Sequence, residues 1–110
     1  MQSLMLIEDL FEPILRGTKH CTIRKGQRPI ESGSLLFKST SGNLQIEVNV
    51  TDVLVKHAGD ITDEEAQKDG AKNAEDLLKN LRVFYPHLVD DDVVTIVTFE
   101  RMAGTLKAVY

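Results

Sequence analysis

The side chains best suited to chemistry lie in one short stretch of the sequence, Gly17–Arg24. It contains the ammonium of Lys19, the hydroxyl of Thr22 and the guanidinium of Arg24. A strand over residues 19–25 would place Thr22 and Arg24 on one face, because successive side chains in a strand alternate. Beside the end of a helix, such a face could bind an anion or a polar ring. The spacing alone also allows a solvated, charged strand edge without a ligand.

Charge is distributed unevenly along the chain. The 110 residues include 13 Lys or Arg and 17 Asp or Glu, which gives a formal net charge of −4. This balance argues against a protein that coats nucleic acid by bulk electrostatics, such as a binder of long duplex DNA. The segment from Arg16 to Arg28, however, contains no acidic residue, so all 17 acidic residues lie elsewhere. The chain is therefore an acidic body with one basic cluster.

The remaining reactive groups favour structural roles. Cys21 is the only cysteine, so no internal disulfide can form, and it shares its predicted strand face with Ile23. We expect a buried thiol in a reducing, cytoplasmic setting. The three histidines are scattered and Asp90–Asp92 is typical of a polar turn, so no metal site is predicted. No phosphate-binding or dinucleotide-binding motif indicates a cofactor.

Composition indicates one globular domain without a membrane segment. A chain of 110 residues matches the usual size of a single domain. Its apolar runs, such as residues 93–97, are far shorter than the roughly 20 residues that span a bilayer. The beginning of the sequence also lacks the basic and then apolar pattern of a signal peptide.

A short strand and a short helix are predicted to precede the basic cluster. Leu4–Ile7 has the apolar character of a buried strand. A capping box at Asp9 and Glu12 would open a helix over residues 10–16, and Gly17 would end it.

The centre of the chain is predicted to be rich in strands, followed by two helices. Ser34–Lys38 and Leu44–Val55 are expected strands, and the second has the clearest alternation of apolar and polar residues. Capping patterns at Thr62 and Asn73 open two helices, which end near Asp69-Gly70 and Tyr85-Pro86. The expected buried face of the second helix consists of Leu77, Leu78, Leu81 and Phe84.

The last predicted core strand is Val93–Phe99, and residues 105–110 could form a further edge strand or a tail. The order is strand, helix, three strands, two helices and one or two strands. This order predicts an α+β fold with a mixed, mostly antiparallel sheet that could close into a small barrel.

The segment Ile14–Arg24 resembles the signature of the ASCH family, in which a helix ending I-L-x-G-x-K runs into T-x-R on a strand. The resemblance continues at residues 30–36, 66–70, 76–86 and 93–99, and covers about residues 4–100. It implies a PUA-like fold: a mixed β-barrel of five or six strands with two or three short helices. The single domain would span residues 1–104. The family also implies RNA or modified-nucleoside biology.

Within this family, the chain is most similar to the small bacterial N4-acetylcytidine amidohydrolases, which release cytidine and acetate. Their proposed catalytic set is a Lys, a Thr and a Glu. The Lys matches Lys19, the Thr matches Thr22, and the adjacent Arg matches Arg24. Since Lys19 is three residues before Thr22, the two share a face only if Lys19 lies in a bend before the strand.

The position of the catalytic Glu falls on Asp69, a shorter carboxylate. Shifting the alignment by one residue, as the Tyr85-Pro86 anchor requires, places it on Gly70 instead. Glu65 on the same predicted helix is the fallback, and Glu47 is a further acid that could point into the site.

The resemblance suggests a mechanism for amide hydrolysis. Thr22 would attack the acetyl carbonyl with Lys19 as its base, and Asp69 would pass a proton to the leaving nitrogen. The predicted substrate-binding residues are Arg24, Arg28 and Tyr85.

Two alternatives remain open at this point. The same basic cleft could bind RNA or a nucleotide without catalysis, or a metal-independent ribonuclease could use Lys19, Arg24 and a nearby Tyr or His. One basic cleft on an acidic body suits a nucleoside or a short RNA element better than a long duplex.

Overall fold

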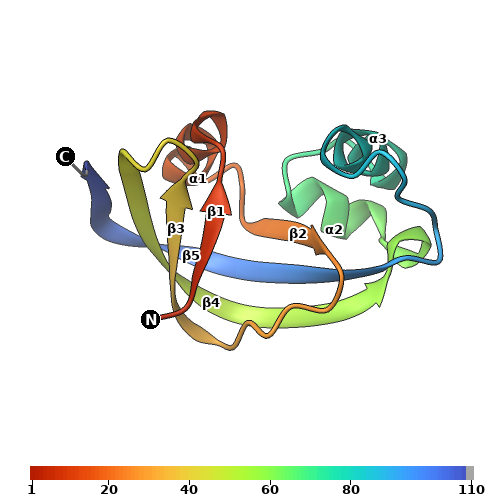
Figure 1. Cartoon of the computed structure of the whole chain (residues 1–110), viewed down its shortest axis with the longest axis horizontal. Coiled ribbons are helices and arrows are strands. Elements are labelled where there is room, and N and C mark those ends of the chain that lie inside the picture. The colour runs from red at the N-terminus through yellow and green to blue at the C-terminus, as the bar shows by residue number, and fades with distance from the viewer. Residues whose placement is uncertain (109–110) are drawn as a thin grey trace.

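The described part of the chain folds around one five-stranded sheet that curves into half of a barrel (Figure 1). The computed structural model describes the backbone of residues 1–108 and the side chains of residues 1–102. The strand order is β1-β3-β4-β5-β2; β1 and β3 run parallel, and the other neighbours run antiparallel. The strands are β1 (Ser3–Leu6), β2 (Cys21–Lys25), β3 (Gly33–Ser39), β4 (Leu44–His57) and β5 (Val93–Ala108).

Short helices cover the two ends of this sheet. α1 (Phe11–Arg16), preceded by the 3-10 helix η1 (Glu8–Leu10), lies beside β1 (Figure 1). α2 (Asp63–Lys68) and α3 (Ala74–Phe84) lie beside β2 and follow a second 3-10 helix, η2 (Ala58–Asp60). This α+β architecture and the order of its elements confirm the prediction from the sequence.

Two separate groups of buried residues hold the fold together. The first core is formed by β1, α1, β3, β4 and β5 and consists of Leu6, Phe11, Ile14, Leu35, Phe37, Ile46, Val48, Val50, Val97 and Phe99. The second core lies between β2, α2 and α3 and consists of Cys21, Ile23, Ala58, Ile61, Ala66, Leu77, Leu81, Leu88, Val94 and Ile96.

The long strand β5 supplies residues to both cores, and with β4 it connects them. The alternation predicted over the first half of β4 is confirmed, because Ile46, Val48 and Val50 are buried. The pairing of β4 with β5 shifts register between Ile46 and Val48 and again between Val50 and Asp52. Such irregularities increase the local bend and twist of a strand. They help the sheet to curve between its two ends.

The beginning of α1 differs from the prediction. Asp9 does not cap the helix: it lies inside η1, and α1 begins at Phe11 without a side-chain cap. The 3-10 turn continues directly into α1, and Leu10 at the N-cap position already has helical dihedral angles. The backbone therefore lacks the extended conformation that a capping side chain needs.

The predicted capping box of α2 is confirmed. Thr62 accepts a hydrogen bond from the backbone N–H of Glu65, and the Glu65 side chain accepts one from the backbone N–H of Thr62. Asn73 likewise caps α3 by accepting from the N–H of Asp76. Both helices therefore begin where the sequence indicates.

The end of the described chain continues β5. Residues 105–108, expected as an edge strand or a tail, extend β5 along β4, where Ala108 is paired with Leu44. Residues 109 and 110 of that prediction lie outside the described residues. None of the described helices is long and apolar enough to cross a membrane.

Candidate functional site

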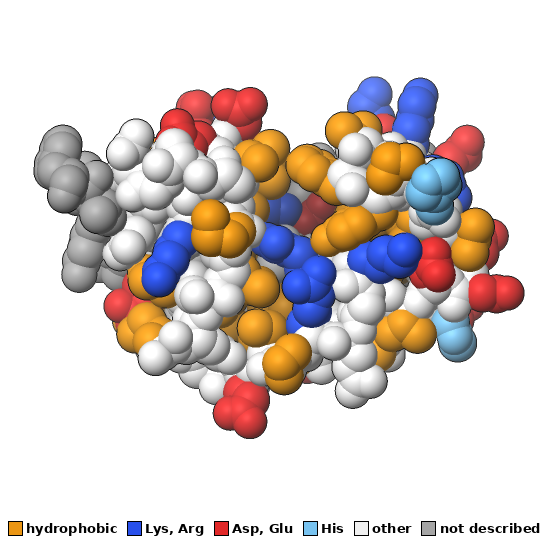
Figure 2. Space-filling view, viewed as in Figure 1, with side chains coloured by type: hydrophobic (Ala, Val, Ile, Leu, Met, Phe, Trp, Pro, Cys, Tyr) orange, Lys and Arg blue, Asp and Glu red, His pale blue; other side chains and the backbone are white. Residues whose placement is uncertain are grey.

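A cavity of about 840 Å³ opens between the two cores, and its lining includes residues of β1 and β2, the two outer strands of the sheet. The lining also includes residues of α1, α3 and the end of α2. Figure 2 shows the hollow between two lobes of the surface, with basic and acidic side chains visible inside it. We call this cavity the cleft.

The end of α1 directs Lys19 into the cleft. Gly17 has a φ of +78°, the left-handed conformation that commonly ends helices. The backbone N–H groups of Thr18 and Lys19 then both donate to the carbonyl of Pro13, at 3.0 and 3.1 Å. β2 consequently begins at Cys21, not at residue 19 as predicted, because these bonds hold the preceding residues in a turn. Lys19 therefore lies in a bend before β2. Its spacing from Thr22 required such a bend if the two side chains were to share a face.

The same bend is attached to the end of α2. The backbone N–H of His20 donates to the carbonyl of Lys68 at 2.8 Å. Asp69 is the next residue and forms the C-cap of α2. This attachment brings Asp69 to Lys19, although the two are 50 positions apart in the sequence.

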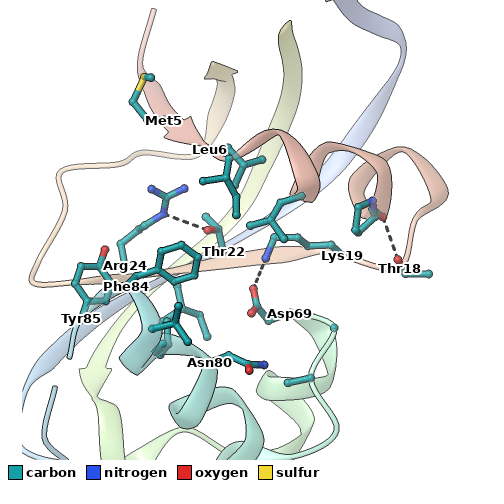
Figure 3. Close-up of a pocket in the computed structure, with 18 of the residues that line it drawn as sticks. Met5, Leu6, Thr18, Lys19, Thr22, Arg24, Asp69, Asn80, Phe84 and Tyr85 are labelled. Atoms are coloured by element: carbon teal, nitrogen blue, oxygen red, sulfur yellow. Dashed lines mark hydrogen bonds and ion pairs between the residues drawn. The ribbon is translucent and has the colours of Figure 1, made fainter. Parts of the chain in front are cut away.

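Lys19 and Asp69 form a buried ion pair in the cleft (Figure 3). Lys19 Nζ lies 2.5 Å from Asp69 Oδ1, and the two side chains are only 6% and 16% exposed. Burial raises the pKa of the Asp69 carboxyl, and the opposing charges of Lys19 and Arg24 do not fully offset this effect. The desolvation of such a pair is costly, so its location beside a cavity points to a use other than stability.

Thr22 and Arg24 share the cleft face of β2, as predicted. The Thr22 side chain is 4% exposed, and its Oγ1 accepts a hydrogen bond from Arg24 Nε at 3.2 Å. Burial lowers the pKa of the Arg24 guanidinium below its usual value. Figure 3 shows the Lys19 ammonium, the Thr22 hydroxyl and the Asp69 carboxylate pointing toward the same space, with Arg24 beside Thr22.

Cys21 lies on the opposite face of β2, in the second core. Its Sγ is 3.9 Å from Asp69 Oδ1 and from the carbonyl oxygen of Glu65. Burial is the main reason that the pKa of the thiol is raised to about 12. A thiol with this pKa stays protonated at neutral pH, so it is not a nucleophile. The buried, structural cysteine predicted from the sequence is thus confirmed.

Tyr85 lines the cleft, together with residues that were not predicted as site residues from the sequence. Asn80 and Phe84 are one helical turn apart on α3, and Met5 lies on β1 (Figure 3). Phe84 was predicted to be buried, but its side chain is 54% exposed. Val83 and Phe84 extend the apolar surface of α3 beyond one face, so they cannot both pack inside. This excess of apolar residues on α3 was the signal in the sequence that could have predicted an exposed Phe84.

The alternative acids do not reach the cleft. Glu65 closes the capping box of α2, and its carboxylate lies 2.8 Å from Lys56 Nζ. Burial raises the pKa of Glu65, but hydrogen bonds from Lys56 and from the Thr62 backbone outweigh it and lower the pKa overall. Glu47 lies on β4 opposite Leu36 and does not line the cleft.

Of the two remaining predicted positions, one lines the cleft and the other does not. Gly70 lines the cleft but has no side chain, and its φ of +94° favours glycine. Arg28 lies outside the lining, where its Nε donates to the carbonyl of Lys25 at 3.0 Å. Within the part of the chain whose side chains are described, no group of three His, Cys, Asp or Glu residues could hold a metal ion.

No protein-family model matches the sequence, and no curated protein matches it significantly. Solved structures nevertheless share its fold. The ASCH domain from Lactobacillus crispatus JV V101 has a TM-score of 0.69 at 16% identity, over 82% of this chain and 68% of that chain. A mutant ASCH protein from Zymomonas mobilis has a TM-score of 0.62 at 11% identity, over 98% and 87% of the two chains.

A third similar structure is the hypothetical protein PH0355. Its TM-score is 0.71 at 22% identity, over 93% of this chain and 100% of that chain. Identities this low establish a shared fold and leave the chemistry to the residues. The chain therefore has the PUA-like fold of ASCH domains, as its resemblance at Ile14–Arg24 predicts.

Proposed function

We propose that this chain, whose fold is that of ASCH domains, hydrolyses the acetyl amide of N4-acetylcytidine to cytidine and acetate. One observation carries the proposal: the buried pair of Lys19 and Asp69 faces a cleft beside the hydroxyl of Thr22. Perturbed ionisable groups cluster at functional sites. A hydroxyl, an ammonium, a carboxylate and the Arg24 guanidinium are also the groups that amide hydrolysis needs. The free thiol of Cys21 supports a reducing compartment such as the cytoplasm.

In the first step, Thr22 Oγ1 attacks the acetyl carbonyl carbon. Lys19 accepts the hydroxyl proton while it passes one of its own protons to Asp69, so that the ammonium keeps its charge. The raised pKa of Asp69 makes it a better proton acceptor than an exposed carboxylate. One of the two terminal NH2 groups of Arg24 stabilises the negative charge on the carbonyl oxygen.

In the second step, the bond between the acetyl carbon and N4 breaks. Asp69 returns its proton through Lys19 to N4, cytidine leaves, and the acetyl group remains as an ester on Thr22. Water then attacks this ester by the same route, which releases acetate and restores the hydroxyl. One water molecule is consumed for each cytidine and acetic acid formed.

The test is to incubate the purified protein with N4-acetylcytidine and to follow cytidine by reversed-phase chromatography. Thr22→Val removes the hydroxyl at nearly constant shape and should lower kcat/KM about 1,000-fold or more. Asp69→Asn should lower it about 100-fold or more through loss of the proton acceptor. Thr51→Val is the matched control, because Thr51 is exposed and lies outside the cleft. No cytidine release by the unmodified protein would refute the activity, and full turnover by Thr22→Val would refute the nucleophile.

A second candidate is binding of RNA or a nucleotide without catalysis. The exposed ring of Phe84 at the cleft favours it, because nucleic-acid bases stack on such rings. This candidate requires that the protein binds a cytidine-containing RNA, that affinity falls with salt, and that no acetate is released. Incubation with RNA in the presence of a chelator separates both candidates from a metal-independent ribonuclease.

A further inference from the structure

Two arginine side chains beside the cleft are fixed through their Nε atoms. Arg24 Nε donates to Thr22 Oγ1, and Arg28 Nε donates to the carbonyl of Lys25. The backbone N–H of Arg28 also donates to Thr95 Oγ1 at 2.9 Å, and this hydroxyl donates back to the same loop. The loop is thus attached to β5. Both guanidinium groups are held in place while their terminal nitrogens can still bind a further partner.

No carboxylate neutralises these two groups. Among residues 1–102, Arg24 and Arg28 form no salt bridge, whereas Arg16 and Arg82 each lie near an acidic side chain. Arg24 is paired with Thr95 across β2 and β5, and Thr95 Oγ1 accepts from the N–H of Arg28, so the loop that carries Arg28 lies beside Arg24. Burial and the charge of Arg28 both lower the pKa of Arg24. Asp69 is the one carboxylate that acts on Arg24, and Lys19 already holds it. Arg24 and Arg28 thus contribute two positive charges without a carboxylate partner of their own among the described side chains.

Figure 2 shows Lys and Arg side chains gathered at the front of the hollow between the two lobes. Like charges held together in a partly buried place destabilise the fold, and a bound anion relieves that cost. Guanidinium groups bind phosphate oxygens well, because their planar N–H donors match phosphate geometry.

We propose that Arg24 and Arg28 form a phosphate subsite and that the ligand of the cleft is a cytidine nucleotide. The identity of the base rests on the proposed function; the phosphate rests on the two guanidinium groups. The base lies inside the cleft near Thr22, and the phosphate lies at the mouth beside Arg28. The ribose connects the two positions.

The phosphate belongs to a mononucleotide and not to a long RNA strand. A strand presents successive phosphates and needs a continuous track of basic residues. Arg24 and Arg28 provide a single position, and all 17 acidic residues lie outside the segment from Arg16 to Arg28. One phosphate therefore satisfies the uncompensated charge.

Calorimetric titration with cytidine and with cytidine 5′-monophosphate at constant ionic strength tests this subsite. The unmodified protein should bind the monophosphate about tenfold more tightly or better, from charge-assisted hydrogen bonds to its phosphate. Arg28→Gln should abolish this preference, and Arg28→Lys, which keeps the charge but not the planar donors, should retain part of it. Arg82→Gln is the control and should keep the full preference, because Arg82 lies beside Asp90 and outside the cleft.

Equal affinities for the two ligands in the unmodified protein would overturn the subsite, as would a full preference in Arg28→Gln. An oligocytidylate that binds much more tightly than the monophosphate would assign the phosphate to an RNA backbone and overturn the mononucleotide. Neither ligand contains an acetyl group, so the result is independent of turnover. Failure of the subsite leaves the proposed hydrolysis intact, and failure of the hydrolysis leaves the preference measurable.

Discussion

The first and second cores are both apolar, but the two walls of the cleft that they support differ in chemistry. The first core contains the edge-to-face pair of Phe37 and Phe99, with ring centroids 5.2 Å apart. The elements around the second core instead carry Thr22, Arg24 and Asp69. One wall is built for stability, and the other holds charged groups at a cost in stability.

This difference suits a planar ligand with one polar edge. The wall formed by β1 and α1 presents Leu6, Leu10 and Pro13 to the cleft, while polar groups line the wall around β2. Lys19 reaches the polar wall from the connection between α1 and β2. β4 and β5 run through both halves, so the relative position of the walls depends on these strands.

The largest expected effect separates stability from chemistry. Phe37→Ala should lower the free energy of unfolding by about 3–5 kcal/mol, because it leaves a cavity in the first core. The hydrolysis rate of each folded molecule should stay unchanged, since Phe37 does not line the cleft. Urea denaturation followed by circular dichroism, with rates corrected for the folded fraction, measures both quantities. A loss of kcat in the folded fraction would show that the two walls are not independent.

The next effect concerns the ion pair. Asp69→Leu should destabilise the fold by about 3–5 kcal/mol, because it leaves the Lys19 ammonium buried without a partner. The double variant Lys19→Met, Asp69→Leu should regain that loss and equal or exceed the original stability, with no activity. Urea denaturation of the three proteins provides the comparison. A double variant as unstable as Asp69→Leu would show that the pair itself stabilises the second core.

A smaller effect is the dependence of stability on pH. Burial raises the pKa of Asp69 above 3.8, the value of an unperturbed carboxyl, so the folded state binds its proton more tightly than the unfolded state. Above about pH 4, this contribution to stability is therefore lost as the pH rises through the folded pKa. Asp69→Asn cannot ionise, so the stability of the original protein relative to this variant should fall from pH 4 upward. Urea denaturation at several pH values measures it, and a relative rise would contradict the raised pKa.

The sequence predicted the elements and the shared face of Thr22 and Arg24 on β2. Alternation alone placed Lys19 inside that strand, whereas β2 begins at Cys21 and Lys19 lies in the bend that the family resemblance required. The alternation in β4 and the capping box at Thr62 depend only on residues close together in the sequence, and the structure confirms both. The error at Asp9 was also local, because a 3-10 turn already occupied the position of the cap. Local patterns thus account for most of the fold.

The contact between Lys19 and Asp69 could not be derived from spacing. It depends on the hydrogen bond from His20 to Lys68, which joins segments far apart in the sequence. The family resemblance supplied Asp69 as a candidate, and the structure brings that carboxylate, not Glu65, to Lys19. Arg28 shares the basic cluster with Arg24, yet the turn after β2 places it outside the cleft lining.

The smallest expected effect on stability tests where the second core ends. Phe84 is 54% exposed, so Phe84→Ala should change the free energy of unfolding by about 0.5 kcal/mol or less. If its ring stacks on the bound base, KM should rise about tenfold at constant kcat. Val89→Ala is the control, because Val89 is 56% exposed and lies outside the cleft. A stability loss of about 2 kcal/mol or more would instead make Phe84 a core residue, as the helical spacing of α3 predicts. Its ring would then not be available to stack on a base in the cleft.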